Sequence, residues 1–331
     1  YPHYHVIGLD NCGPYSRRSS LTDLESQAKI HVVVADICDS KAIDRVYHDF
    51  GIDTVVNFAA ESHNDRAIID PTSFVQSNVF GAQCLLEVSR QRGVRRHVHV
   101  STIEVYGEQD AFTQFFTESS PLNAKTPYSA AKAAGDLMVR AYMQTYRKMD
   151  ICMTHCANNY GPFQFPEKLI PLCITNVLRG KKVPLYGDGK QSRDWLHVDD
   201  HCHAIELILN HEGKFLIGED ASTNACSLPI FDISARQEMT NIQIVECILD
   251  EMGVSFNENV EFVQDRPNHD RRYLINPTKI EQLLGFKPKV AFEQGLRAVV
   301  RWYQLNKEWW EPIINEAPPA INWNTVKVPG L

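Results

Sequence analysis

The stretch His31-Val-Val-Val-Ala-Asp36 decides the fold. A short run of β-branched residues that ends in an acidic residue is typical of a strand buried on both faces of a parallel sheet. Runs of the same kind occupy residues 5–10, 53–60 and 96–102. Between them the sequence predicts helices over residues 40–50, 73–92 and 126–147. Strands that alternate with helices indicate an α/β protein with a Rossmann-like, doubly wound parallel sheet.

The carboxyl ends of these strands are the expected ligand-binding edge, since ligands of doubly wound sheets bind there. The residues at those ends are Asp10, Asp36, Ala59, Ala60, Ser101 and Thr102. A dinucleotide-binding sheet also uses a Gly-rich turn at a helix N-terminus, and no G-x-G-x-x-G occurs in this sequence. We therefore expect residues 1–155 to form a nucleotide-binding domain that lacks its first βα unit. Asp10 then either binds an adenine ribose or is only a turn former before Asn11.

The second half of the chain, residues 156–331, is less regular and richer in proline and loops. We expect it to form mainly a smaller α/β substrate domain, with segments at about 192–212 and 269–285 returning to the first domain. Helical patterns occur near residues 240–252 and 292–306. Residues 219–235 have mixed polarity and contain a proline, so we interpret them as a surface loop.

The composition limits the possible functions. A formal charge of −8 argues against a nucleic-acid surface, which needs a clustered basic face. No run approaches the ~20 apolar residues of a membrane-spanning helix. Nine cysteines without a regular framework indicate reduced thiols in a cytoplasmic protein. We expect no metal site, because Cys152 and Cys156 lack the usual C-x2-C spacing and a helix would turn the histidines of His201-Cys202-His203 apart.

The segment Tyr128-Ser-Ala-Ala-Lys132 carries the clearest chemistry. Residues four apart share one face of a helix, so we expect the Lys132 ammonium to favour the ionised form of the Tyr128 phenol. Such a tyrosine can take a proton from a hydroxyl while a hydride leaves the same carbon. The spacing also arises by chance on amphipathic helices, but the motif Ser101-Thr-Ile-Glu-Val-Tyr-Gly107 lies just upstream. Together they predict a nicotinamide-dependent enzyme.

Several longer motifs carry a resemblance to a known family. They are Phe58-Ala-Ala-Glu-Ser-His63, Asn158-Asn-Tyr-Gly-Pro162, Phe165-Pro-Glu-Lys-Leu-Ile-Pro171, Gln191-Ser-Arg-Asp-Trp-Leu196 and Asp265-Arg-Pro-Asn-His-Asp-Arg-Arg-Tyr273. With the two motifs above, they resemble the extended short-chain dehydrogenase/reductases that act on nucleotide sugars. The similarity is greatest to the dTDP-glucose 4,6-dehydratase type and runs nearly from end to end.

The resemblance implies an NAD cofactor, a nucleotide-diphosphate sugar as substrate, and a role for each matched residue. Tyr128 matches the base for the sugar 4-hydroxyl, and Lys132 matches the residue that lowers the pKa of this base and binds the nicotinamide ribose. Thr102 matches the hydroxyl that hydrogen-bonds the reacting oxygen. Glu104 matches the base for the C5 proton. The expected NAD-binding positions are Asp10, Asp36, Ile37, Ala59, Ala60, Ser62, Tyr128 and Lys132. The expected substrate-binding positions are Thr102, Asn158, Glu167, Lys168, Arg193 and Arg266. Helices 73–92 and 126–147 match those that form a homodimer interface in the family.

Ile103 departs from the family pattern. The dehydratases have aspartic acid there, which protonates the departing C6 hydroxyl, and related decarboxylases have serine. Three interpretations stay open: a 4,6-dehydratase in which Glu104 shuttles the proton, a UDP-sugar decarboxylase or epimerase, and a catalytically impaired homologue that binds nucleotide sugar. The identity of the nucleotide base also stays open.

Overall fold

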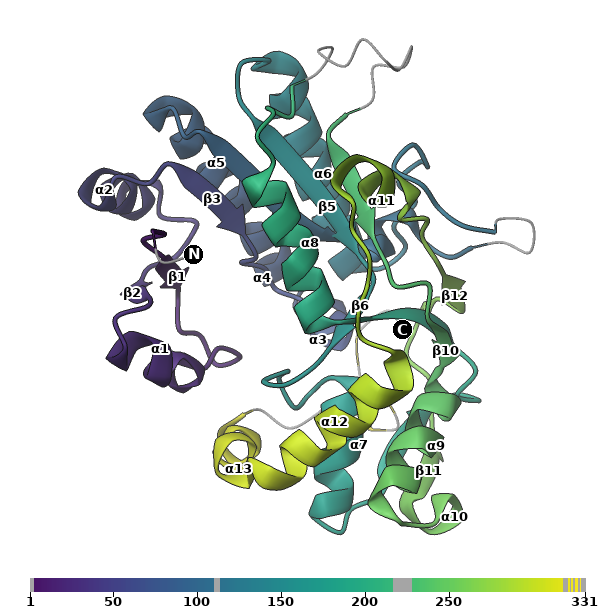
Figure 1. Cartoon of the computed structure of the whole chain (residues 1–331). Helices are drawn as coiled ribbons and strands as arrows, with labels where there is room; N and C mark the ends of the chain where they lie inside the picture. Colours follow the sequence, from purple (N-terminus) through teal and green to yellow (C-terminus); the bar gives the residue numbers. More distant parts are fainter. Residues whose placement is uncertain are drawn as a thin grey trace. The chain divides into compact units, whose positions relative to one another are not determined.

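The computed structural model describes residues 3–109, 114–216 and 228–317, together with a few single residues after 320, as an α/β protein (Figure 1). Its strands are β1 (Ile7–Asp10), β2 (His31–Val34), β3 (Thr54–Asn57), β4 (Arg96–Thr102), β5 (Ile151–Cys156), β6 (Asn158–Tyr160), β7 (Val183–Tyr186), β8 (Ser192–His197), β9 (Ile230–Ile233), β10 (Glu238–Thr240), β11 (Val260–Val263) and β12 (Arg272–Tyr273).

The α-helices are α1 (Thr22–Ser26), α2 (Ser40–Phe50), α3 (Asn64–Ile69), α4 (Pro71–Val75), α5 (Ala82–Arg92), α6 (Pro127–Thr145), α7 (Leu169–Leu178), α8 (Val198–Asn210), α9 (Asn241–Met252), α10 (Phe256–Asn259), α11 (Thr278–Leu284), α12 (Phe292–Leu305) and α13 (Lys307–Glu316). Two 3₁₀ helices, η1 (Arg18–Leu21) and η3 (Ile103–Tyr106), and one π-helical segment, η2 (Gln76–Gly81), complete the described elements. Among the described residues, no helix is long and apolar enough to cross a membrane.

The predicted parallel strands are confirmed. β1 pairs with β2 in parallel, and β3 pairs with β4 in parallel within a sheet of order β3-β4-β5-β9. In the first pair Asp10 lies opposite Val34, so the carboxyl ends of both strands lie at one edge of the sheet. Within the described residues β1 and β3 share no hydrogen-bonded ladder, so the expected single sheet is divided into two parts.

The predicted helices are confirmed as well, and α2 shows why the sequence located them. The Asp39 carboxylate caps its N-terminus by accepting from the Lys41 and Ala42 N–H groups, and Gly51 ends it in a left-handed conformation. The predicted helix over 73–92 is the continuous run α4, η2 and α5, which widens into a π-helix at residues 76–81.

The interpretation of residues 219–235 as a surface loop is wrong for its last part. Residues 217–227 lie outside the described residues, but Ile230–Ile233 form β9, a fully buried strand beside β5. The mixed polarity and the proline of the whole segment had indicated a loop. The Asp232 carboxylate instead accepts a hydrogen bond from the Tyr106 hydroxyl at 2.9 Å, and this pairing allows the strand to be buried.

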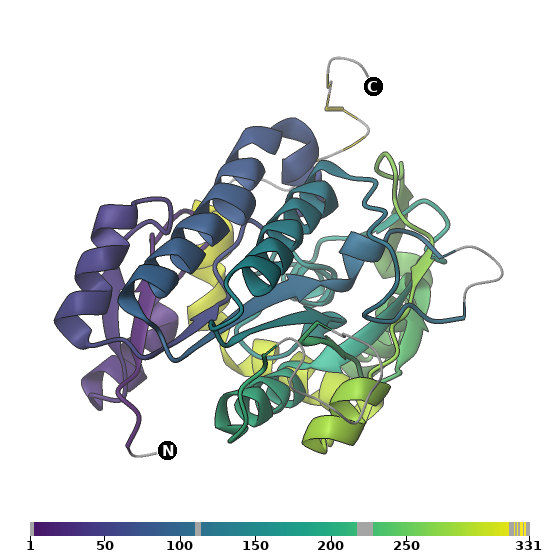
Figure 2. The same cartoon turned by 90° about the horizontal axis from the view of Figure 1, so that it is seen from above.

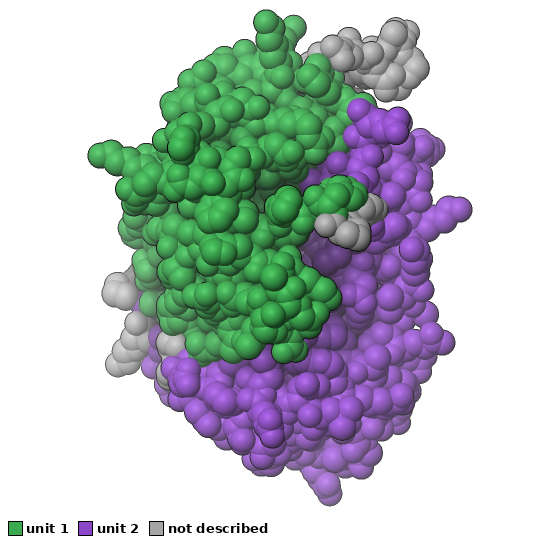
Figure 3. All heavy atoms as spheres, turned by 60° about the vertical axis from the view of Figure 1, so that its left-hand side comes forward, with its two compact units in different colours: residues 1–101, 130–153, 213–230 green, residues 102–129, 154–212, 231–331 purple. Residues whose placement is uncertain are grey.

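The chain divides into two compact units, coloured separately in Figure 3. Unit 1 comprises residues 1–101, 130–153 and 213–230, and unit 2 comprises residues 102–129, 154–212 and 231–331. In unit 1 the helices α5 and α6 run side by side (Figure 2), and Leu86 of α5 shares an apolar cluster with Val139 of α6. The main core of unit 2 is formed by apolar side chains of α7, α9 and α12, such as Ile174, Ile244 and Leu296.

Candidate active site

The turn after β4 carries two of the predicted catalytic residues. β4 ends at Thr102, the N-cap of η3, whose hydroxyl oxygen accepts a hydrogen bond from the Glu104 N–H at 3.3 Å. Gly107 follows η3 with φ +75°, and a Cβ atom there would lie 2.2 Å from the Asn123 carbonyl oxygen. Only glycine permits this approach, so the motif that ends at Gly107 fixes the direction in which the chain leaves Glu104.

Tyr128 lies in the first turn of α6, which two neighbouring hydroxyl residues cap. The Ser129 N–H donates to the Thr126 hydroxyl at 3.2 Å, and the Thr126 N–H donates to the Ser129 hydroxyl at 3.1 Å. Tyr128 is buried, and its phenol is hydrogen-bonded to the Thr102 side chain, within reach of the Glu104 charge. The structure therefore brings Thr102, Glu104 and Tyr128 together, and their role in oxidising a hydroxyl stays a prediction.

The pKa of Tyr128 is shifted in the direction opposite to the one expected from Lys132. Burial raises this pKa well above the usual range for tyrosine, and the Glu104 carboxylate raises it further, while the hydrogen bond with Thr102 lowers it. Lys132 is also buried, and its ammonium donates a hydrogen bond to the Val100 carbonyl oxygen at 2.9 Å. Loss of hydration around the phenol is the largest influence on its pKa.

Ile103, the first residue of η3, lies in the sequence between Thr102 and Glu104 and is buried. Its side chain is 1% exposed. A sec-butyl group has no proton to transfer. Any proton that leaves with a hydroxyl group must therefore come from another residue.

Arg193 on β8 is engaged mainly by backbone carbonyl groups. Its guanidinium donates to the Ser192 carbonyl oxygen at 2.8 Å and to the Asp270 carbonyl oxygen at 2.8 Å. The guanidinium carbon also lies 4.2 Å from the centre of the Tyr273 ring, a cation–π contact. These contacts hold Arg193 rigidly beside the segment before β12. Its predicted role as a ligand of a diphosphate stays a prediction.

Two residues that sequence reasoning did not single out belong to the same cluster, Asp270 and Tyr273. Both are buried, and the charge of Glu104 acts on both. Burial, together with Glu104, raises the pKa of Asp270 to about 6, against the opposing effect of the Arg193 charge. Both residues lie in the motif Asp265 to Tyr273, and that motif was the signal that could have found them.

A buried polar network supports η3 from its last residue. The Tyr106 hydroxyl is 2.7 Å from His155 Nδ1 and donates to Asp232 Oδ1 at 2.9 Å, while the two latter atoms lie 3.2 Å apart. The Glu118 carboxylate accepts from the Asp232 N–H at 3.1 Å. All three side chains of the inner triad are at most 1% exposed. The network fixes the end of η3 and hence the turn that carries Glu104.

The other predicted substrate-binding residues lie on several elements of unit 2. Asn158 begins β6, and Glu167 and Lys168 immediately precede α7, of which Lys168 is the N-cap. Arg266 follows β11 in a loop where the Asp265 carboxylate accepts from the Arg266 N–H at 2.8 Å. All four are partly buried. Their role toward a substrate stays a prediction.

The predicted cofactor residues lie after the strands of unit 1. Asp10 ends β1 and its carboxylate accepts from the Cys12 N–H at 2.6 Å, while the Asp36 carboxylate, just after β2, accepts from the Cys38 N–H at 2.8 Å. The residues that follow β2 and β3 include the buried Ile37, the partly buried Ala59, and the exposed Ala60 and Ser62. Two carboxylates at the ends of paired strands suit the hydroxyls of an adenosine.

Comparison with known proteins assigns the family. Residues 2–299 match the family described as GDP-mannose 4,6 dehydratase. The chain belongs to this family. The dTDP-glucose 4,6-dehydratase of Streptomyces niveus is 45% identical over 281 residues, which are 85% of this chain and 78% of that protein. The dTDP-glucose 4,6-dehydratase of Neisseria meningitidis serogroup B is 40% identical over 329 residues, 94% of this chain and 89% of that protein.

Solved structures of this dehydratase family have the same fold. The dTDP-glucose 4,6-dehydratase DesIV of Streptomyces venezuelae, solved with NAD and TYD bound, matches with a TM-score of 0.84 and 42% identity over 93% of this chain and 90% of that one. The UDP-glucuronic acid 4-epimerase of Bacillus cereus matches with a TM-score of 0.81 at 23% identity, over 92% of each chain. The dehydratase match confirms the predicted Rossmann-like α/β fold, and the epimerase match extends to the fold alone.

Proposed function

We propose that this dehydratase-family chain is an NAD-dependent lyase that converts dTDP-glucose to dTDP-4-keto-6-deoxyglucose. The observation that carries the proposal is the cluster in unit 2, where the buried Tyr128 is hydrogen-bonded to Thr102 and lies within reach of Glu104. This is the set that the oxidation of a hydroxyl and the removal of a neighbouring proton require. The relatives at 40–45% identity are dTDP-glucose 4,6-dehydratases.

The residues present fit the adenosine and ribose parts of NAD. We assign the adenine ribose to the exposed Asp10 carboxylate, the adenine surroundings to Asp36 and Ile37, and the nicotinamide ribose to Tyr128 and Lys132. Ala59, Ala60 and Ser62 follow β3 and line the same expected edge. When bound, NAD supplies a reversible acceptor for the hydride of C4. Residues 1–155 carry these positions, and residues 156–331 carry the proposed sugar and diphosphate ligands Asn158, Glu167, Lys168, Arg193 and Arg266.

Proton transfers can be assigned to individual side chains. Tyr128 takes the proton of the 4-hydroxyl, and Thr102 holds the same oxygen by a hydrogen bond. Since burial and Glu104 raise the pKa of Tyr128, its phenolate is a strong base that is scarce at neutral pH, and the oxidation rate should increase with pH. Once C4 is a ketone, the C5 proton is acidic, and Glu104 removes it. Ile103 contributes no proton to the departing C6 hydroxyl.

The decisive experiment supplies dTDP-glucose to the NAD-loaded protein and analyses the product by mass spectrometry and NMR. A 4-keto-6-deoxy sugar supports the proposal, and the Tyr128→Phe variant, which keeps the ring but has no acidic proton, should form none. Carbon dioxide released from a UDP-uronate would instead indicate a decarboxylase, and an inverted C4 configuration would indicate an epimerase. Binding of dTDP-glucose without any product would leave only a nucleotide-sugar-binding homologue.

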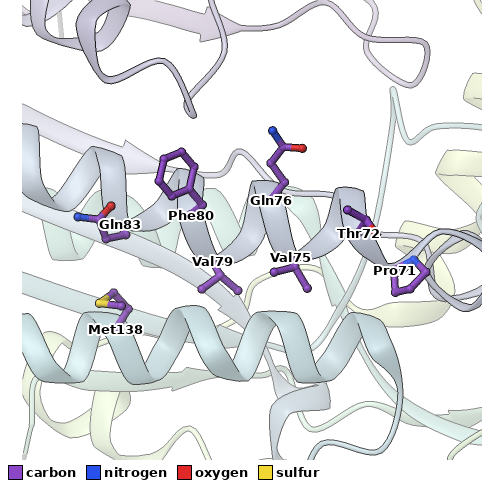
Figure 4. A pocket seen from close by; sticks show the side chains of 8 residues that line it. All are labelled: Pro71, Thr72, Val75, Gln76, Val79, Phe80, Gln83 and Met138. Atoms are coloured by element: carbon purple, nitrogen blue, oxygen red, sulfur yellow. The ribbon is translucent and has the colours of Figure 1, made fainter.

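We further propose a homodimer formed through α4, η2 and α6. A groove between these helices in unit 1 is lined largely by apolar side chains, including Val75, Val79, Phe80 and Met138 (Figure 4). Val75 and Phe80 are more than half exposed, and Leu137 on α6 is 58% exposed. A second copy of the chain would cover these exposed apolar side chains.

A cytoplasmic location is also proposed. The eight cysteines that the structure describes are all free thiols, as a reducing compartment would keep them.

A further inference from the structure

Asp270 differs from the other buried aspartates of unit 2. Asp194 accepts from Ser234 and Gln237, Asp200 accepts from the Lys289 and Val290 N–H groups, and Asp232 accepts from Tyr106. Asp270 is 6% exposed, yet its carboxylate forms no hydrogen bond or ion pair with any residue that the structure describes. Only its backbone carbonyl is engaged, by Arg193.

Hydrogen bonds hold the segment of Asp270 against the segment of Glu104. The Gln109 N–H donates to the Arg272 carbonyl oxygen at 2.9 Å, and the Gln109 side chain accepts from the Leu274 N–H at 2.9 Å. The Glu108 carboxylate accepts from the Arg271 N–H at 2.7 Å. β12 and η3 consequently pack together. The two chain segments that carry Glu104 and Asp270 therefore lie next to each other in unit 2 and are joined by hydrogen bonds.

The charged groups around Asp270 favour its protonated form. Burial raises the pKa of its carboxyl most, the charges of Glu104 and Glu108 raise it further, and those of Arg193 and Lys125 lower it, with a result of about 6. A carboxylic acid with a pKa in this range holds a transferable proton near neutral pH, which is the requirement for a general acid.

We propose that Asp270 is the acid that donates a proton to the departing C6 hydroxyl, the function that Ile103 cannot perform. This inference rests on the proposed dehydratase function and assigns its missing acid. Glu104 takes the C5 proton, the C6–O bond breaks, and the Asp270 proton leaves with the oxygen as water. The hydride taken from C4 then reduces C6, and Glu104 returns a proton to C5. At the end of the cycle Tyr128 releases to solvent the proton that it took from the 4-hydroxyl, and Asp270 takes up a proton from solvent. Both side chains thereby return to their starting forms.

The test is a comparison of Asp270→Asn with the wild-type protein in single-turnover experiments with dTDP-glucose. The amide has nearly the same shape but no acidic proton. We expect NADH to form from bound NAD at the wild-type rate and then to accumulate, with elimination of water slowed by about 10²–10⁴-fold, the usual contribution of a general acid. In the wild-type protein the elimination rate should fall as pH rises above about 6, and the variant should lack this dependence.

A second variant separates a chemical role from a structural one. Ile103→Asp, combined with Asp270→Asn, places a carboxylic acid next to Glu104 and should restore elimination. Asp188→Asn is the matched control, because Asp188 is an exposed aspartate held by Arg271 outside this cluster, and it should behave as the wild type.

Three results would overturn the assignment. One is wild-type elimination by Asp270→Asn, which would favour Glu104 as a proton shuttle. Another is loss of NADH formation in Asp270→Asn without recovery in the double variant, which would indicate a structural role. The third is a wild-type protein that forms neither NADH nor product from dTDP-glucose; in that case the proposed function itself fails, and the role of Asp270 fails with it.

Discussion

Replacing Asp270 by asparagine should stabilise the fold at alkaline pH, and the effect can be worked out from its burial. The folded-state pKa of the carboxyl is raised from 3.8 to about 6. A raised folded-state pKa means that the folded protein binds the proton more tightly than the unfolded chain. The contribution of this proton to stability is complete below about pH 4 and is lost as pH rises through 6.

The size of the effect follows from the shift of roughly two pKa units. At ~1.4 kcal/mol per unit, ionised Asp270 lowers the free energy of unfolding by about 3 kcal/mol at high pH, and about half of this change develops between pH 5 and pH 8. Asparagine does not titrate. The difference in unfolding free energy between variant and wild type should therefore increase by about 1–2 kcal/mol from pH 5 to pH 8.

Urea unfolding, followed by both tryptophan fluorescence and circular dichroism at the two pH values, measures this difference. Any constant cost of burying the amide cancels, because only the change with pH is compared. Asp188→Asn is the control without a pH effect: Arg271 lowers the pKa of Asp188 to about 2, so this carboxyl is ionised in the folded and the unfolded protein at both pH values, and the difference from the wild type should not change between pH 5 and pH 8. A difference for Asp270→Asn that stays constant with pH would refute the reasoning, since the carboxyl would then not be held in its acid form by the fold.

Three further perturbations test other parts of the structure. Tyr106→Phe removes the hydroxyl that donates to Asp232 and should lower the unfolding free energy by about 1–3 kcal/mol in urea; an unchanged midpoint would contradict it. Gly135→Ala places a methyl 2.4 Å from the Asn78 carbonyl oxygen. It should destabilise the protein by about 1–3 kcal/mol, seen as a lower melting temperature. Leu137→Glu on α6 should convert the proposed dimer to a monomer in light scattering, with an unchanged circular dichroism spectrum.

The elements that were predicted from sequence are those specified by neighbouring residues. The helix over 40–50 has its own aspartate cap and its own C-terminal glycine, and the strand over 31–36 is a run of β-branched residues. β9 was missed for the opposite reason. The residue that makes its burial tolerable is Tyr106, which lies 126 positions away in the chain. The residues close to Asp232 in the sequence do not reveal that partner, so its burial could not be predicted from them.

Some features of the candidate site could likewise be predicted from neighbouring residues, and others could not. Thr102, Glu104 and Tyr128 could be predicted because two short motifs place them at a strand end and a helix start. The pKa of Tyr128 could not, because spacing along a helix says nothing about how completely the phenol is buried. Asp270 could not be singled out either, since its surroundings depend on Gln109, which is 165 positions from the Leu274 backbone it binds.

The energetics of Asp270 support a chemical role more strongly than a structural one. A buried carboxylate normally compensates for its lost hydration by accepting hydrogen bonds, as Asp194, Asp200 and Asp232 do. Asp270 has no such partner among the described residues, so its ionisation weakens the fold, and a neutral amide or an apolar side chain would remove that cost. Active sites often contain ionisable residues that lower the stability of the fold but are needed for the reaction, and Asp270, which is destabilising and lies near the base Glu104, fits this pattern. Ile103 and Asp270 are then complementary: the first adds apolar packing to the turn, and the second supplies the acid from a different segment.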